Sequence, residues 1–152
     1  MPGKASSTSW RELADLLIRL GANTGHDLRQ LWRRIVFSVC VSNTDDHLRN
    51  HGFTLTRTGW LLAPAYDLNP NRFGHGLTLN ISESDNAQSL DLAREVAPYF
   101  RVTEVQAREV VSEVVAAVRT WPEVATARGL SHAAQDRMRE AFRVATSAKQ
   151  AG

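Results

Sequence analysis

The sequence predicts a mainly α-helical fold with one small β-hairpin. Apolar residues recur at helical spacing after Ser9 and again after Thr103, and each run begins with a capping-box pattern. In the middle third, residues 53–56 and 60–62 alternate like strands on either side of a turn at 57–59, which indicates an antiparallel hairpin. The chain has 152 residues, 43% of them hydrophobic, which is enough for one compact core in a single domain.

The N-terminal third is predicted to hold two helices. In the first, leucine recurs at helical spacing between Ser9 and Gly21, and the glycine suits its end. We expect Asp27 to cap the second, whose apolar stripe continues to Val41. Between the hairpin and the next helical segment, Leu77–Leu79 form a weak candidate for a third strand.

The last third of the chain returns to a helical pattern. A short helix is expected before Pro98, and a longer one from the cap at Thr103 to about Trp121. Pro122 suits the first turn of another short helix, and Ser131 is expected to cap the last one.

Composition excludes several classes of protein. The longest apolar run, residues 35–41, is too short to span a membrane, and the polar N-terminus does not look like a signal peptide. The single cysteine, Cys40, excludes an internal disulfide framework and is expected to be buried and inert. A net charge of +2 predicts no direct contact with nucleic acid and no membrane contact, and a cytoplasmic location is expected. We expect one lobe at 9–147 between flexible tails at 1–8 and 148–152.

Two polar segments flank the hairpin and carry the candidate chemistry. The first, at 43–50, contains Asp45 and Asn50 with the D-x-x-x-x-N spacing of a kinase catalytic loop. There the carboxylate orients and deprotonates an attacking hydroxyl, while an amide oxygen and a second carboxylate, here Asp67, hold Mg²⁺. The spacing alone is common, because Asp and Asn side chains also bind the local backbone in turns and caps.

Neighbouring side chains leave alternatives open. Asp46 competes with Asp45 as the base, but only Asp45 stands at the required distance from Asn50; Asp46 is expected to cap a turn or to be solvated. His47 and His51 have helical i, i+4 spacing, which on a helix suits a metal ion beside an aspartate. An unrelated metal-dependent hydrolase is therefore a second hypothesis, although the pattern lacks the glutamate of H-E-x-x-H.

The longer strings F-S-V-C-V-S-N-T-D-D-H-L-R-N-H-G-F and W-L-L-A-P-A-Y-D-L-N-P carry a more specific signal. Over roughly residues 10–145 the chain resembles the HipA-type serine/threonine kinases of bacterial toxin–antitoxin systems. The resemblance implies a protein-kinase-like C-terminal lobe, with Asp45 as the catalytic base, Asn50 as a magnesium ligand and Asp67 as the metal-binding aspartate that follows the hairpin. It also implies Mg²⁺ and ATP as cofactors, a protein serine or threonine as acceptor, and a HipB-like helix-turn-helix antitoxin as partner. His47 is expected to order the catalytic loop.

Half of a kinase nucleotide site is not found in the sequence. No G-x-G-x-x-G occurs, and the two lysines, Lys4 and Lys149, lie near the ends of the chain. A kinase needs a phosphate-binding loop and a lysine against the phosphates. An upstream segment or a separate N-lobe subunit is expected to supply them, and the chain alone is expected to be inactive. The alternative is a non-catalytic module that sequesters an antitoxin or a target protein.

Overall fold

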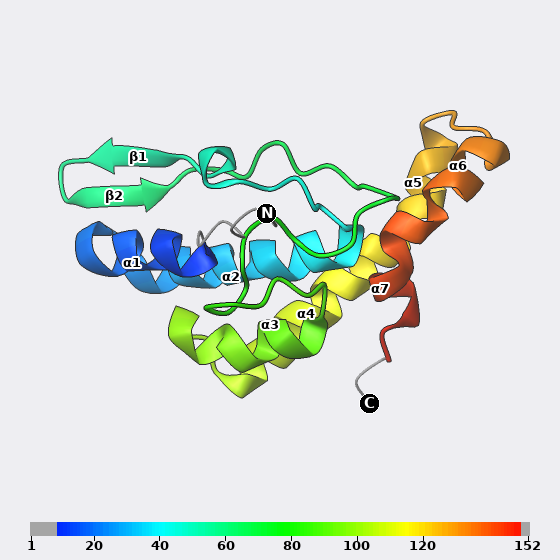
Figure 1. The fold of residues 1–152 in the computed structure, drawn as a ribbon. Coiled ribbons are helices and arrows are strands. Elements are labelled where there is room, and N and C mark those ends of the chain that lie inside the picture. Colours follow the sequence, from blue (N-terminus) through cyan, green and yellow to red (C-terminus); the bar gives the residue numbers. More distant parts are fainter. Residues whose placement is uncertain (1–8, 150–152) are drawn as a thin grey trace, which may run out of the picture.

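The structure is a computed structural model, and it describes residues 9–149. Figure 1 shows a hairpin along one side of a helical body, with a pair of helices standing at the far end. In chain order the elements are α1 (Trp10–Leu20), α2 (Thr24–Val41), a 3₁₀ turn (Leu48–Asn50), β1 (Phe53–Thr56), β2 (Gly59–Leu62), α3 (Leu90–Val96), a second 3₁₀ turn (Ala97–Phe100), α4 (Glu104–Arg119), α5 (Trp121–Ala127), α6 (His132–Met138), a third 3₁₀ turn (Arg139–Phe142) and α7 (Arg143–Ser147). The prediction of a mainly helical fold with one hairpin is confirmed.

Helix α2 is the centre of the core. It packs against α1, α3, α4, α7 and strand β2, with the hairpin on one side and α3 and α4 on the other (Figure 1). Its side chains Leu31, Trp32 and Ile35 are completely buried. Burial of each such side chain contributes about 1.5–3 kcal/mol. The Trp32 indole also donates a 2.8 Å hydrogen bond to the Ala93 carbonyl, which ties α2 to α3.

The start of α1 follows the prediction, and the start of α2 does not. Ser9 donates its backbone N–H to the Glu12 carboxylate (3.2 Å), as a capping box requires. Helix α2 begins at Thr24, so the prediction that Asp27 caps it is wrong. Asp27 lies in the first turn of α2, where it is buried, and its carboxylate accepts a 2.9 Å hydrogen bond from the Leu62 backbone N–H. A tertiary contact to the hairpin has taken the place of a local cap.

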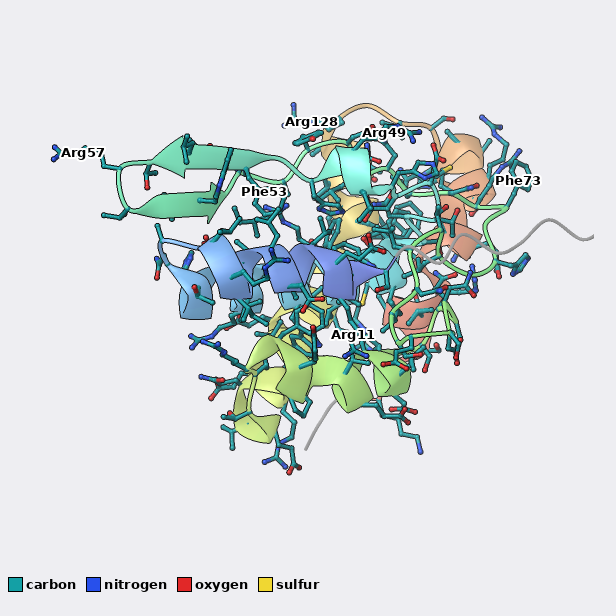
Figure 2. The ribbon with its side chains drawn as sticks, turned by 60° about the vertical axis from the view of Figure 1, so that its left-hand side comes forward. Arg11, Arg49, Phe53, Arg57, Phe73 and Arg128 are labelled. Atoms are coloured by element: carbon teal, nitrogen blue, oxygen red, sulfur yellow. The ribbon has the colours of Figure 1, made fainter. Side chains whose placement is uncertain are left out.

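The sheet consists of β1 and β2 alone within the described part of the chain. The strands pair in antiparallel register from Phe53 opposite Leu62 to Thr56 opposite Gly59. In Figure 2 Arg57 marks the tip of this hairpin. The third strand predicted at Leu77–Leu79 is wrong: the segment is buried but irregular, and the Leu77 N–H bonds to the carbonyl of Asn86 in the same loop.

The C-terminal third is more broken than predicted. The helix expected after Ser131 divides into α6, a 3₁₀ turn and α7, although Ser131 caps α6 as predicted. Trp121 at the start of α5 stacks on Phe142, with ring centroids 4.5 Å apart and an interplanar angle of 12°. The tail predicted at 1–8 and residues 150–152 lie outside the described residues.

Two predictions from composition can be compared with the structure. Within residues 9–149, no helix is both long and apolar enough to cross a membrane. Cys40 is fully buried in the core, as predicted. Burial raises the pKa of its thiol to about 12, so the thiol stays protonated and unreactive near neutral pH.

Candidate functional site

Two of the three predicted site residues touch directly. Asn50 closes the 3₁₀ turn after α2, whereas Asp67 lies on the segment that leaves β2. The hairpin returns the chain, so the Asn50 side-chain amide donates a 2.7 Å hydrogen bond to the Asp67 carboxylate. The two side chains therefore meet in the fold although they lie 17 residues apart in sequence.

Asp45 joins this pair through His47. The Asp45 carboxylate and His47 Nε2 lie 3.0 Å apart, and the His47 backbone N–H donates to the Asn50 amide oxygen at 2.9 Å. The four residues thus form one hydrogen-bonded chain from Asp45 to Asp67. The Asp45 side chain is 90% exposed, so much of its carboxylate faces solvent. That His47 orders the loop stays a prediction, which these two contacts support.

Asp67 is held in an unusual backbone conformation. Its φ angle is +56°, in the left-handed region that non-glycine residues seldom adopt. Such a conformation costs about 1–3 kcal/mol and is often found at functional sites. Tyr66 anchors the segment by donating from its hydroxyl to the Arg49 carbonyl (2.7 Å), and Asn69 donates to the other Asp67 oxygen (2.6 Å). Figure 2 shows Arg49 on the short turn beyond the hairpin.

Asp46 is neither solvated nor a turn cap, so that expectation is wrong. Its carboxylate lies 3.0 Å from His51 Nε2, and the side chains are only 2% and 1% exposed. Arg34 on α2 reaches the other His51 nitrogen at 3.4 Å and also donates to the Ala63 carbonyl. Burial lowers the pKa of the Arg34 guanidinium, and the nearby carboxylates of Asp46 and Asp27 act in the opposite direction.

The two histidines do not form a common site. His47 pairs with Asp45, whereas His51 is enclosed with Asp46 beneath the edge of the Trp10 ring, 4.6 Å between centroids. Between Ser9 and Lys149 no group of three His, Cys, Asp or Glu side chains is arranged to hold a metal ion. The hypothesis of a metal-dependent hydrolase is therefore not supported, because it required His47 and His51 to share one site.

The loop that follows Asp67 supports the catalytic loop from outside. Asn71 donates to the Thr44 hydroxyl (2.9 Å), and the Thr78 hydroxyl donates to the Thr44 carbonyl (2.6 Å). Gly74 packs so closely on Thr44 that an added Cβ would lie 2.2 Å from its hydroxyl oxygen. Thr44 directly precedes Asp45, so this packing limits where Asp45 can lie.

A separate hollow of about 640 Å³ lies between α2, α4 and the segment that leaves β2. Arg34 and Leu68 line it, but Asp45, Asn50 and Asp67 are not among its lining residues. The hollow therefore lies behind the site rather than at its chemical centre.

Sequence reasoning missed Arg34, His51 and Asp46 as one unit. The signal available was two adjacent aspartates and a histidine five residues after the second. A sequence does not show which of two neighbouring carboxylates turns inward, because their burial depends on the path of the loop.

A family model described as HipA-like C-terminal domain matches residues 2–121. No curated protein matches. A chain in the Shewanella oneidensis MR-1 structure of the toxin–antitoxin system HipA, HipB and its operator DNA matches with a TM-score of 0.69 and 14% identity.

The structural match covers most of this chain but only part of the matched chain. It covers 92% of this chain but 34% of the matched chain, so this chain spans about a third of that protein's length. The match confirms the predicted fold. The prediction of no contact with nucleic acid is not borne out, because the matched assembly includes operator DNA.

Proposed function

Because the chain belongs to the HipA-like C-terminal domain family, we propose that it is the C-terminal catalytic lobe of a serine/threonine protein kinase. The reaction would transfer a phosphoryl group from Mg-ATP to a hydroxyl of another protein. The observation that carries the proposal is the 2.7 Å contact between Asn50 and Asp67, linked through His47 to the exposed Asp45.

Asp45 is the proposed catalytic base. One of its carboxylate oxygens is engaged by His47, which fixes the orientation of the group. The acceptor hydroxyl would bind the open side of the carboxylate and give up its proton there as its oxygen attacks phosphorus. Positioning of this kind is the main contribution that a protein makes to phosphoryl transfer.

Asn50 and Asp67 are the proposed holders of Mg²⁺. Carboxylate and amide oxygens are hard ligands of the kind that Mg²⁺ prefers, and the ion usually retains waters and leans on substrate phosphates. When bound, the ion would neutralise charge on the phosphates. Ion binding by both residues would replace their direct hydrogen bond, since the Asn50 amide N–H now faces Asp67. The donor set therefore fits the ion.

A partner is part of the proposal. The sequence has no G-x-G-x-x-G and no lysine between residues 4 and 149, so the groups that hold the ATP phosphates would come from an N-lobe subunit or an upstream segment. A HipB-like antitoxin is the proposed regulatory partner, and a cytoplasmic location stays a prediction. A lobe that lacks the groups that hold the ATP phosphates should show little activity by itself, because a single such group can raise kcat by about 10³-fold or more.

The lack of these groups in the sequence also favours a second candidate, a non-catalytic module that binds an antitoxin, an antitoxin–DNA complex or a target protein. Pull-down of a HipB-like antitoxin separates the two. A module that only binds retains the antitoxin equally well when Asp45 and Asp67 are both replaced by alanine, and it shows no transfer with any N-lobe.

The test of the kinase is transfer of the ATP γ-phosphate to protein after addition of a glycine-rich, lysine-bearing N-lobe domain. Asp45→Asn removes the base but keeps the size of the side chain, and should lower kcat by about 10²- to 10⁴-fold. Asp91→Asn is the matched control, since Asp91 is exposed on α3 and, within the described part of the chain, its one ion pair is with Arg94. Unchanged transfer by Asp45→Asn would overturn the assignment of the base.

A further inference from the structure

The buried charges behind the site have no role in the proposed chemistry. Arg34, Asp46 and His51 are each at least nine-tenths buried, whereas the proposed base Asp45 is exposed. One oxygen of Asp46 has no hydrogen-bond partner among residues 9–149. Burial of charged groups is expensive, and apolar residues in their place are often equally stabilising. Stability alone therefore does not explain why these three residues are buried here.

Arg34 contacts both segments that build the site. Through its Nη1 it reaches His51, which follows Asn50, and through its Nη2 it donates to the carbonyl of Ala63, four residues before Asp67. Arg34 stands on α2, the most deeply buried helix of the core, so it provides a rigid reference point. Asp27, seven residues earlier on the same helix, accepts from the Leu62 N–H and fixes the same strand end.

The donors and acceptors assign the state of His51. A guanidinium group only donates hydrogen bonds, so His51 Nδ1 must accept, and a carboxylate only accepts, so Nε2 must carry the proton toward Asp46. The Asp46–His51 contact then closes a loop over residues 46–51. Asp45 lies directly before this closed loop, and Asn50 is its second-to-last residue.

From this geometry we infer that Arg34, His51 and Asp46 form a positioning unit, which we call the Arg34 junction, and that it sets Asp45 and Asn50 in register with Asp67. The junction acts through the loop and the strand end, and it touches neither substrate nor ion. Its effect on catalysis rests on the proposed function, but the ordering of the two segments does not.

Hydrogen–deuterium exchange of the full chain tests the ordering without any substrate. Arg34→Met keeps the apolar stem and removes the donors, and should raise exchange in peptides 43–52 and 62–68 by about tenfold or more while peptide 104–119 is unchanged. The matched control is Arg33→Met, because Arg33 is its neighbour on α2 but pairs with the exposed Glu113 (2.5 Å). Unchanged exchange in either segment, or an equal rise in all peptides, would overturn the inference.

Two replacements at His51 separate positioning from simple filling of space. His51→Gln retains an acceptor and a donor on one side chain, whereas His51→Leu fills the volume and has neither. We expect His51→Leu to loosen peptides 43–52 and 62–68 and His51→Gln to restore most of the protection. Equal exchange in the two variants would show that only packing matters, and the junction would be rejected.

The transfer assay gives an independent outcome. With the N-lobe added, Arg34→Lys should lower kcat by about 10-fold or more with KM for ATP changed less than about twofold, since a small misplacement mainly affects the reacting geometry. If exchange rises only in the two segments but no variant ever transfers phosphate, the ordering role of the junction stands and the proposed kinase function is rejected. Normal kcat in Arg34→Lys, together with loosened segments, would show that the junction does not position catalytic groups.

Discussion

At the scale of single residues, the site combines two exposed carboxylates, Asp45 and Asp67, with the buried Asn50 that bonds to Asp67. A long motif in the sequence predicts Asp45, Asn50 and Asp67 as site residues, and their roles stay a prediction. It was not sufficient to predict that Asp46 is buried while Asp45 is 90% exposed. Adjacent aspartates have the same chemistry, and only the path of the loop decides which one meets His51.

Gly74 gives a residue-scale test of the packing around the catalytic loop. Gly74→Ala places a methyl group 2.2 Å from the Thr44 hydroxyl oxygen and 2.8 Å from its Cβ, so it should lower the free energy of unfolding by about 1–3 kcal/mol. Gly25→Ala in α2 is the matched control, because nothing lies within 4 Å and alanine favours helix by about 0.5–1 kcal/mol.

Urea unfolding of the two variants provides the measurement. Opposite signs of the change in unfolding free energy support the tight contact between Gly74 and Thr44. If Gly74→Ala is as stable as the unchanged chain, the loop after Asp67 does not press on the catalytic loop as described.

At the scale of elements, local patterns predicted the helices and the hairpin but not the contacts between them. Ser9, Thr103 and Ser131 are found at helix starts, because capping is a local interaction. Asp27 was misread as a cap since its partner, the Leu62 N–H, lies 35 residues away. Leu77–Leu79 alternate like a strand, but the described part of the chain offers them no neighbouring strand.

The contact from α2 to β2 can be tested at the same scale. Asp27→Ala removes the acceptor of the Leu62 N–H and leaves a half-buried donor unpaired, so the free energy of unfolding should fall by about 1–3 kcal/mol. The Leu62 amide should also exchange faster, as amide-resolved NMR measures. The control is Glu113→Ala, because Glu113 is exposed and its ion pair, among the residues that the structure describes, is with Arg33; the replacement should change the free energy of unfolding by less than about 0.5 kcal/mol. A slow Leu62 amide in Asp27→Ala would argue against the contact.

At the scale of the whole molecule, the chain spans 34% of the matched chain from the complex of HipA, HipB and operator DNA. Its described residues join Asp45 to Asp67 in one hydrogen-bonded chain, in which the proposed function assigns one base and two ion ligands. The sequence lacks a glycine-rich loop and a central lysine, which leads to the expectation of an N-lobe partner, but its residues carry no information about the structure of that partner. What the fold contributes is the alignment of two loops by one buried helix.

The proposed function requires that Asn50 and Asp67 together hold a divalent ion beside Asp45. Magnesium titration of the ¹⁵N-labelled chain, followed by NMR of the Asn50 side-chain amide, tests it most directly. We predict that this amide and the backbone amides of residues 66–69 shift together, with half-saturation in the millimolar range, and that Asp67→Ala abolishes the shift. An Asn50 amide that stays unmoved while magnesium shifts resonances elsewhere would contradict the account.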